Sequence, residues 1–74
     1  MTQTPTLQDI KTGEKALVIA VDAPEAERGR LESMGILPGV EVGVLADNGG
    51  PILVSVGDAR MAVERKLAAM VIVA

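Results

Sequence analysis

The sequence contains no cysteine, no histidine and no aromatic residue. Without cysteine the chain can form no disulfide. Without histidine, cysteine or tyrosine, nucleophilic and acid–base chemistry would fall to hydroxyls, lysines and carboxylates. Ser33 and Ser55 are the candidate nucleophiles, and neither has a partner that the sequence makes visible. We therefore predict that the protein is not an enzyme.

The absence of aromatic side chains also excludes two kinds of binding site. Polyproline grooves are lined by aromatic rings, and single-stranded nucleic acids are commonly held by stacking on such rings. The chain also carries a formal net charge of -3, with no basic field to neutralise phosphates. We therefore expect neither a polyproline ligand nor a nucleic-acid partner.

Long apolar runs are absent as well, although apolar residues make up 49% of the chain. The longest runs are Ala16–Val21 and Leu67–Ala74, and a bilayer span needs about 20 such residues. We expect no membrane insertion and a cytoplasmic location. A length of 74 residues predicts a single domain over 1–74, with residues 1–5 loose at its start.

What the chain does have is a series of short apolar segments separated by glycine-rich turns. Each segment is alternating or β-branched and has strand length, which predicts a mainly β fold. Five such strands in so few residues favour a small closed barrel, because closure hides the edges of the sheet. The predicted strands are 16–21, 40–45, 52–56, 60–63 and 70–73.

One helix is expected between the first two strands. Pro24 fits the first helical position, where its missing N–H costs nothing. Gly35 fits the left-handed position after the last turn, and Leu31 and Ile36 then make the apolar contact of a Schellman motif. The sequence therefore predicts that the helix ends at Gly35.

A tight turn is expected directly after the helix, over residues 37–40. Pro38 in its second position and Gly39 in its third are typical of a type II turn. Gly35 and Gly39 are therefore interpreted as structural turn residues rather than as binding residues.

Asp22, Glu25 and Glu27 lie close together at the predicted start of the helix. We favour their interpretation as surface charges that complement the helix dipole. They are also weak candidates for a metal site, but carboxylates alone would bind only hard cations weakly. The sequence predicts no cofactor and no tight metal site.

The order of these features resembles the FeoA family of ferrous iron transport proteins. The most specific stretch runs through Arg30-Leu31, Gly35-Ile36 and Pro38-Gly39, and the resemblance extends from Leu7 to Val73. It implies an SH3-like barrel with an inserted helix, and no catalytic residues. It also implies a small cytosolic partner of FeoB, the membrane transporter for ferrous iron.

Protein–protein contact is the function that these predictions favour. The candidate surface comprises Arg30, Leu31, Met34, Leu37 and Pro38, at the end of the helix and the following turn. For Leu31 burial in the core is the favoured alternative, whereas for Met34 and Leu37 both alternatives remain open.

Other functions and assemblies also stay open at this stage. One is a separate interaction domain that regulates a metal-dependent repressor or another protein. Another is a weak divalent-cation sensor that uses the carboxylates of 22–27. The aliphatic strand predicted at 70–73 leaves pairing with a second copy open, as a homo-oligomer.

Overall fold

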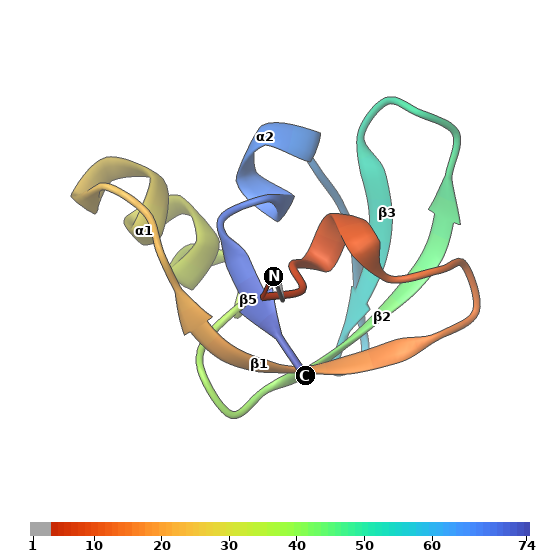
Figure 1. Cartoon of the computed structure of the whole chain (residues 1–74), viewed down its shortest axis with the longest axis horizontal. Helices are drawn as coiled ribbons and strands as arrows, with labels where there is room; N and C mark the ends of the chain where they lie inside the picture. Colours follow the sequence, from red (N-terminus) through yellow and green to blue (C-terminus); the bar gives the residue numbers. More distant parts are fainter. Residues whose placement is uncertain (1–3) are drawn as a thin grey trace.

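The computed structural model describes residues 4–74, which form five antiparallel strands, two helices and one 3-10 turn. The strands make one sheet in the order β4-β3-β2-β1-β5 (Figure 1). Along the chain the elements are η1 (Leu7–Asp9), β1 (Lys15–Val21), α1 (Glu25–Ser33), β2 (Glu41–Asp47), β3 (Ile52–Val56), β4 (Ala59–Val63), α2 (Arg65–Ala68) and β5 (Val71–Val73).

The prediction of a closed barrel is wrong, because β4 and β5 are the two edges of the sheet and do not pair with each other. The outer edge of β5 is instead occupied by the segment before η1, because Thr6 forms an isolated bridge with Ile72. Side chains from η1 and α2 complete the core, with Leu7, Leu67 and Ala68 all buried. The sheet is therefore strongly curved but open.

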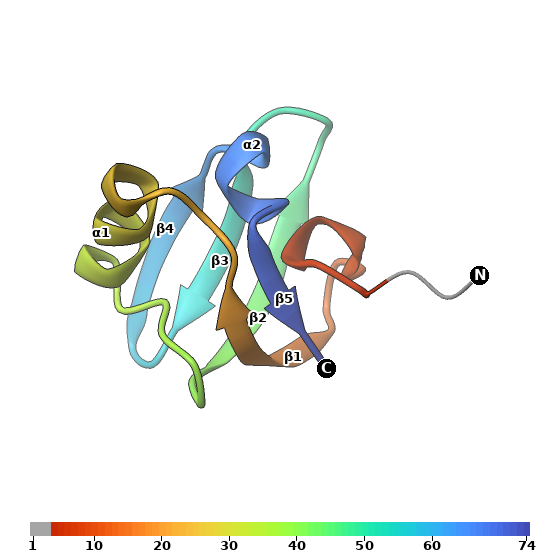
Figure 2. The ribbon, with the colours of Figure 1, turned by 60° about the vertical axis from the view of Figure 1, so that its left-hand side comes forward.

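The β5 edge of the sheet has a neighbouring segment. The backbone N–H of Val73 donates to the carbonyl of Pro5 at 3.0 Å, and Thr6 forms an isolated bridge with Ile72. Figure 2 shows η1 next to β5, and α1 on the opposite side of the molecule. Of the start that we predicted to be loose, Pro5 is thus attached to β5, and residues 1–3 lie outside the described part.

Two register shifts bend the sheet. One lies between Val18 and Ala20 in the β1–β5 pair, and the other between Val44 and Ala46 in the β2–β3 pair. The residue inside each shift is an exposed aliphatic one, Ile19 at 49% and Leu45 at 38%. An extra residue in one strand increases its bend and twist, so both shifts help to wrap the sheet around its core.

The core is entirely aliphatic. Within residues 4–74 every buried side chain is Ala, Val, Leu or Ile, and none is polar or charged. No helix in this part of the chain is long and apolar enough to cross a membrane. The packing thus depends on aliphatic side chains from all five strands, together with Leu31 from α1.

The C-terminal end of α1 confirms the predicted Schellman motif. Gly35 has a φ of 83°, its N–H donates to Glu32 at 2.9 Å, and the N–H of Ile36 donates to Leu31 at 3.0 Å. Leu31 and Ile36 are both fully buried, as that motif requires. The start of the helix differs from the prediction, because Pro24 occupies the N-cap and the helix begins at Glu25.

The turn after the helix also follows the prediction. Gly39 has a φ of 92°, and the N–H of Val40 donates to the carbonyl of Leu37 at 3.1 Å. Gly39 and Val40 are in turn hydrogen-bonded to Val18 of β1, at 2.8 Å in each direction. We call residues 35–39 the corner, and these bonds attach the corner firmly to β1.

A polar clasp joins the β2–β3 turn to α2. Arg65 donates to the carboxylate of Asp47 and to the carbonyl of Gly49, the latter at 3.2 Å, and the Gly49 N–H donates to Asp47 at 3.1 Å. The Gly49 N–H and the Arg65 guanidinium hold the pKa of Asp47 below its ordinary value of 3.8, although partial burial acts in the opposite direction.

Gly35→Val should lower the free energy of unfolding by more than about 1 kcal/mol, because a β-branched residue is strained at positive φ. The added side chain would also meet Val56, whose Cγ1 lies 3.5 Å from the Cβ position. Chemical denaturation measures the change. Gly29→Ala is the control, because its added Cβ would meet nothing within 4 Å. This substitution should stabilise the helix by about 0.5–1 kcal/mol, because alanine has the higher helix propensity. An unchanged midpoint for Gly35→Val would contradict the left-handed cap.

Asp47→Asn should lower the melting temperature at neutral pH. The melting temperature of this variant should also fall less than that of the wild type as the pH is lowered. The folded pKa of Asp47 lies below the unfolded one, so its stabilisation is complete above the unfolded pKa and disappears as the pH falls through the folded pKa. Thermal melts between pH 7 and pH 2 test this.

The control for the acid melts is Asp58→Asn, which removes an equal charge from an exposed turn. The difference between wild type and Asp47→Asn should shrink toward low pH, whereas Asp58→Asn should show no such convergence. Parallel curves for wild type and Asp47→Asn would contradict the clasp.

Candidate functional site

The structure divides the predicted partner surface into exposed and buried residues. Leu31 is fully buried, which is the alternative that the sequence favoured, so its side chain is not available to a partner. Met34 is half-buried and packs against the core. Arg30 is exposed, and its guanidinium lies 3.6 Å from the carboxylate of Glu64 at the start of α2. These three residues therefore contribute little open apolar surface.

Leu37 and Pro38 are the exposed apolar residues of the corner. Leu37 is 39% exposed, whereas Ile36, the residue before it, is fully buried. The two positive-φ glycines fix this arrangement, because they reverse the chain on either side of Leu37 and Pro38. The corner thus presents an aliphatic side chain and a rigid ring together.

Beside Leu37 and Pro38 lies an open hollow of about 360 Å³. Its wall consists of the last residues of β1 and one face of α1, and it is lined by Ala20, Val21, Arg28, Glu32, Leu37 and Pro38. We call this hollow and its lining residues the corner surface. The small side chain of Ala20 leaves the space that the hollow occupies.

The corner surface has an apolar floor and one charge of each sign on its α1 side. Arg28 and Glu32 are four residues apart, so they lie on the same face of the helix. Arg28 also donates to the carbonyl of Ala23 at 3.4 Å, which links it to the segment before the helix. Glu32 and Ala20 were not predicted to be partner-binding residues. The four-residue spacing was the available signal for the charged pair.

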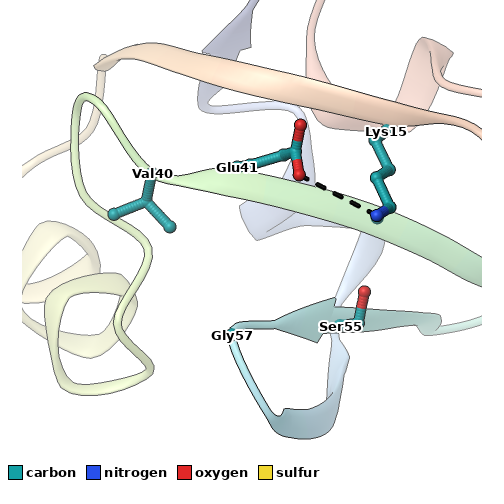
Figure 3. Close-up of a pocket in the computed structure, with 6 residues that line it drawn as sticks. Lys15, Val40, Glu41, Ser55 and Gly57 are labelled. Atoms are coloured by element: carbon teal, nitrogen blue, oxygen red, sulfur yellow. Dashed lines mark ion pairs between the residues drawn. The ribbon is translucent and has the colours of Figure 1, made fainter.

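A second, more polar hollow of about 280 Å³ lies on the outer face of the sheet. Figure 3 shows Lys15 and Glu41 on neighbouring strands above it, and Ser55 and Gly57 across from them. The Lys15 ammonium lies 3.9 Å from the Glu41 carboxylate, and both side chains are about two-thirds exposed, at 69% and 66%. Such a pair contributes about 0–1 kcal/mol, so it is easily opened.

The carboxylates considered as a metal site do not come together. Within residues 4–74 no group of three or more Asp and Glu side chains could hold a metal ion, and this includes Asp22, Glu25 and Glu27. Ser33, one of the two hydroxyls considered as a nucleophile, donates to the carbonyl of Arg30 at 2.7 Å. Its hydroxyl is therefore engaged with its own helix.

Comparison with known proteins gives a consistent family. The model of the FeoA domain matches residues 6–74. The crystal structure of an iron uptake regulatory protein, FeoA, is 35% identical with a TM-score of 0.89, and 96% of each chain is covered. A zinc complex of FeoA from Stenotrophomonas maltophilia is 33% identical with a TM-score of 0.85, over 95% of this chain and 89% of that one.

The Stenotrophomonas maltophilia protein is described as a procaryotic SH3 domain protein and suggested to be a ferrous iron transport activating factor. A manganese-dependent transcriptional repressor shares the fold, with a TM-score of 0.82 at 23% identity, and this chain covers 44% of its length. No curated protein sequence matches. The fold is thus SH3-like, and the chain belongs to the FeoA family of ferrous iron transport proteins.

Proposed function

We propose that this protein is a cytoplasmic accessory factor of ferrous iron uptake, and that it acts by direct contact with the cytoplasmic part of a FeoB-type transporter. Membership of the FeoA family implies the accessory role in ferrous iron transport. The contact surface that we assign to the transporter is the corner surface around Leu37 and Pro38.

The observation that carries this assignment is the exposure of Leu37 and Pro38 above a hollow. A leucine that is 39% exposed on a rigid, hydrogen-bonded corner is already arranged for contact, so little conformational entropy is lost when a partner covers it. The adjacent hollow can accept an apolar side chain of the partner, and Arg28 and Glu32 can fix its orientation.

The chemistry of this surface also favours binding over catalysis. Its lining residues are four apolar side chains and one ion of each sign, without a hydroxyl or an amide. Such a combination provides apolar contact at the centre and charge recognition at the rim, which is the usual anatomy of a protein–protein interface. We therefore assign the corner surface to a protein partner.

The first prediction from this proposal concerns the location of the interface. Titration of the isotope-labelled protein with the cytoplasmic domain of a FeoB-type transporter from the same source should shift the amide resonances of Ala20, Val21 and residues 28–39. NMR spectra measure these shifts. Shifts confined to β3 and β4 would contradict the corner surface, and the absence of shifts at high micromolar concentration would contradict binding to the cytoplasmic domain.

The second prediction uses a matched pair of exposed leucines. Leu37→Ser should weaken binding to the same domain about tenfold, because a leucine buried in an interface contributes about 1.5–3 kcal/mol. Leu53→Ser is the control, since Leu53 is 38% exposed on β3 and lies outside the corner surface. Calorimetry gives both dissociation constants, and equal losses for the two variants would show that the corner surface is not the specific site.

A further inference from the structure

A row of residues crosses the outer face of four strands. In the sheet register Lys15 pairs with Gly43, Gly43 with Ser55, and Ser55 with Arg60. Residues paired across antiparallel strands point to the same face. The row therefore begins and ends with a cation, on β1 and β4, and has a bare backbone and a hydroxyl between them. We call it the Lys15–Arg60 row.

Gly43 lies in the middle of this row, where two neighbouring side chains pack over its bare backbone. A Cβ at Gly43 would lie 2.7 Å from the Ser55 hydroxyl oxygen and 3.4 Å from Cγ of Lys15. The neighbouring side chains thus stand directly over the glycine and leave no room for a larger residue. The absence of a side chain exposes the Ser55 hydroxyl to the hollow that Lys15 and Glu41 border (Figure 3).

The charge of this row differs from that of the whole protein. The chain has 10 acidic and 7 basic residues, yet the Lys15–Arg60 row has two cations and no anion. Glu41 is the nearby carboxylate, and it competes for Lys15 across 3.9 Å of an exposed pair. An incoming anion can replace it at small cost, because exposed ion pairs contribute little to stability.

Apolar residues follow two positions away along the strands. Leu53, which is 38% exposed, pairs with Ala46 on one side and with Ala62 on the other. Leu53 and Ser55 are two residues apart on β3, so their side chains lie on the same outer face of the sheet. Two residues along a strand span about 6.8 Å. An aliphatic strip thus runs parallel to the cationic row at the distance between alternate residues of an extended chain.

We infer that the outer face of β2, β3 and β4 binds an extended acidic segment of a protein partner. In this inference, a carboxylate of the segment accepts from Lys15, Ser55 and Arg60 over Gly43. A leucine-like side chain two positions further along contacts Leu53 and Ala62. Charge complementarity selects an acidic segment. The spacing of about 6.8 Å between the row and the aliphatic strip equals that of alternate residues in an extended chain, which selects an extended one. The site shares no lining residue with the corner surface.

The probe is a synthetic peptide, acetyl-Ser-Glu-Ser-Leu-Ser-amide, titrated into the isotope-labelled full chain and followed by NMR. Its glutamine analogue is the first control, and inorganic phosphate is the second. We expect shifts at Gly43, Ser55, Leu53 and Arg60 with the glutamate peptide, and weaker shifts with the glutamine peptide. Equal binding of both peptides would overturn the inference. Phosphate that displaces the peptide and matches its affinity would show a general oxyanion site instead, and would overturn the assigned occupant.

Three variants on the same face give effects of opposite sign. Lys15→Met and Arg60→Met should each weaken peptide binding about two- to fivefold, whereas Glu41→Gln should strengthen it by a similar factor, because it removes the competing carboxylate. Lys66→Met is the control, since it removes an equal charge from α2 outside the row. If Lys66→Met weakens binding as much as Lys15→Met, the effect is one of net charge and the inference fails.

This test is separate from that of the transporter contact. Leu37→Ser should leave peptide binding unchanged, and Leu53→Ser should weaken it, which is the reverse of their expected effects on the FeoB-type domain. Gly43→Ala adds a steric test, because its Cβ would lie 2.7 Å from the Ser55 hydroxyl oxygen and displace that hydroxyl. It should abolish the peptide shifts while the thermal melt remains cooperative; retained binding by the folded Gly43→Ala protein would contradict the site.

Discussion

The burial of a wholly aliphatic core is the constraint on which the rest of this structure depends. Within residues 4–74 no polar or charged side chain is buried, and no aromatic ring is present to fill space. Aliphatic side chains are small, so the sheet must curve tightly around them to exclude water. The two register shifts, in β1 and β2, contribute this curvature.

The same constraint moves recognition to the outer surface. A core without polar groups contains no buried charge or hydroxyl that could be tuned for chemistry, so specificity depends on what the surface presents. Positive-φ glycines and a glycine within a strand shape that surface. Gly35 and Gly39 have positive φ on either side of the exposed Leu37 and Pro38. Gly43 places a bare backbone between Lys15 and Ser55 in the row.

Much of this could be predicted from local sequence patterns, and the remainder could not, for identifiable reasons. The helix end and the turn at Gly39 follow from backbone sterics, which act over a few residues and are visible in the sequence. The prediction of a closed barrel was wrong because closure requires β4 and β5 to pair, whereas the free edge of β5 is bridged by Thr6. Such a contact joins opposite ends of the chain.

The candidate surfaces show the same division. Leu37 and Pro38 were found because they follow the predicted helix end and begin the predicted turn. The Lys15–Arg60 row was missed because the first two of its paired members are 28 and 12 residues apart along the chain, and only the register of β1 to β4 brings the row into line. The uniform apolar run 16–21 also gives no sign of the bulge at Ile19.

The two surfaces lie at opposite ends of β1, which bears on how partners can use them. Lys15 opens the strand and Ala20 is near its close, so five residues, or about 17 Å, separate them along the strand. Because both surfaces include residues of β1, this strand would set the spacing between the two partner segments that we propose for them.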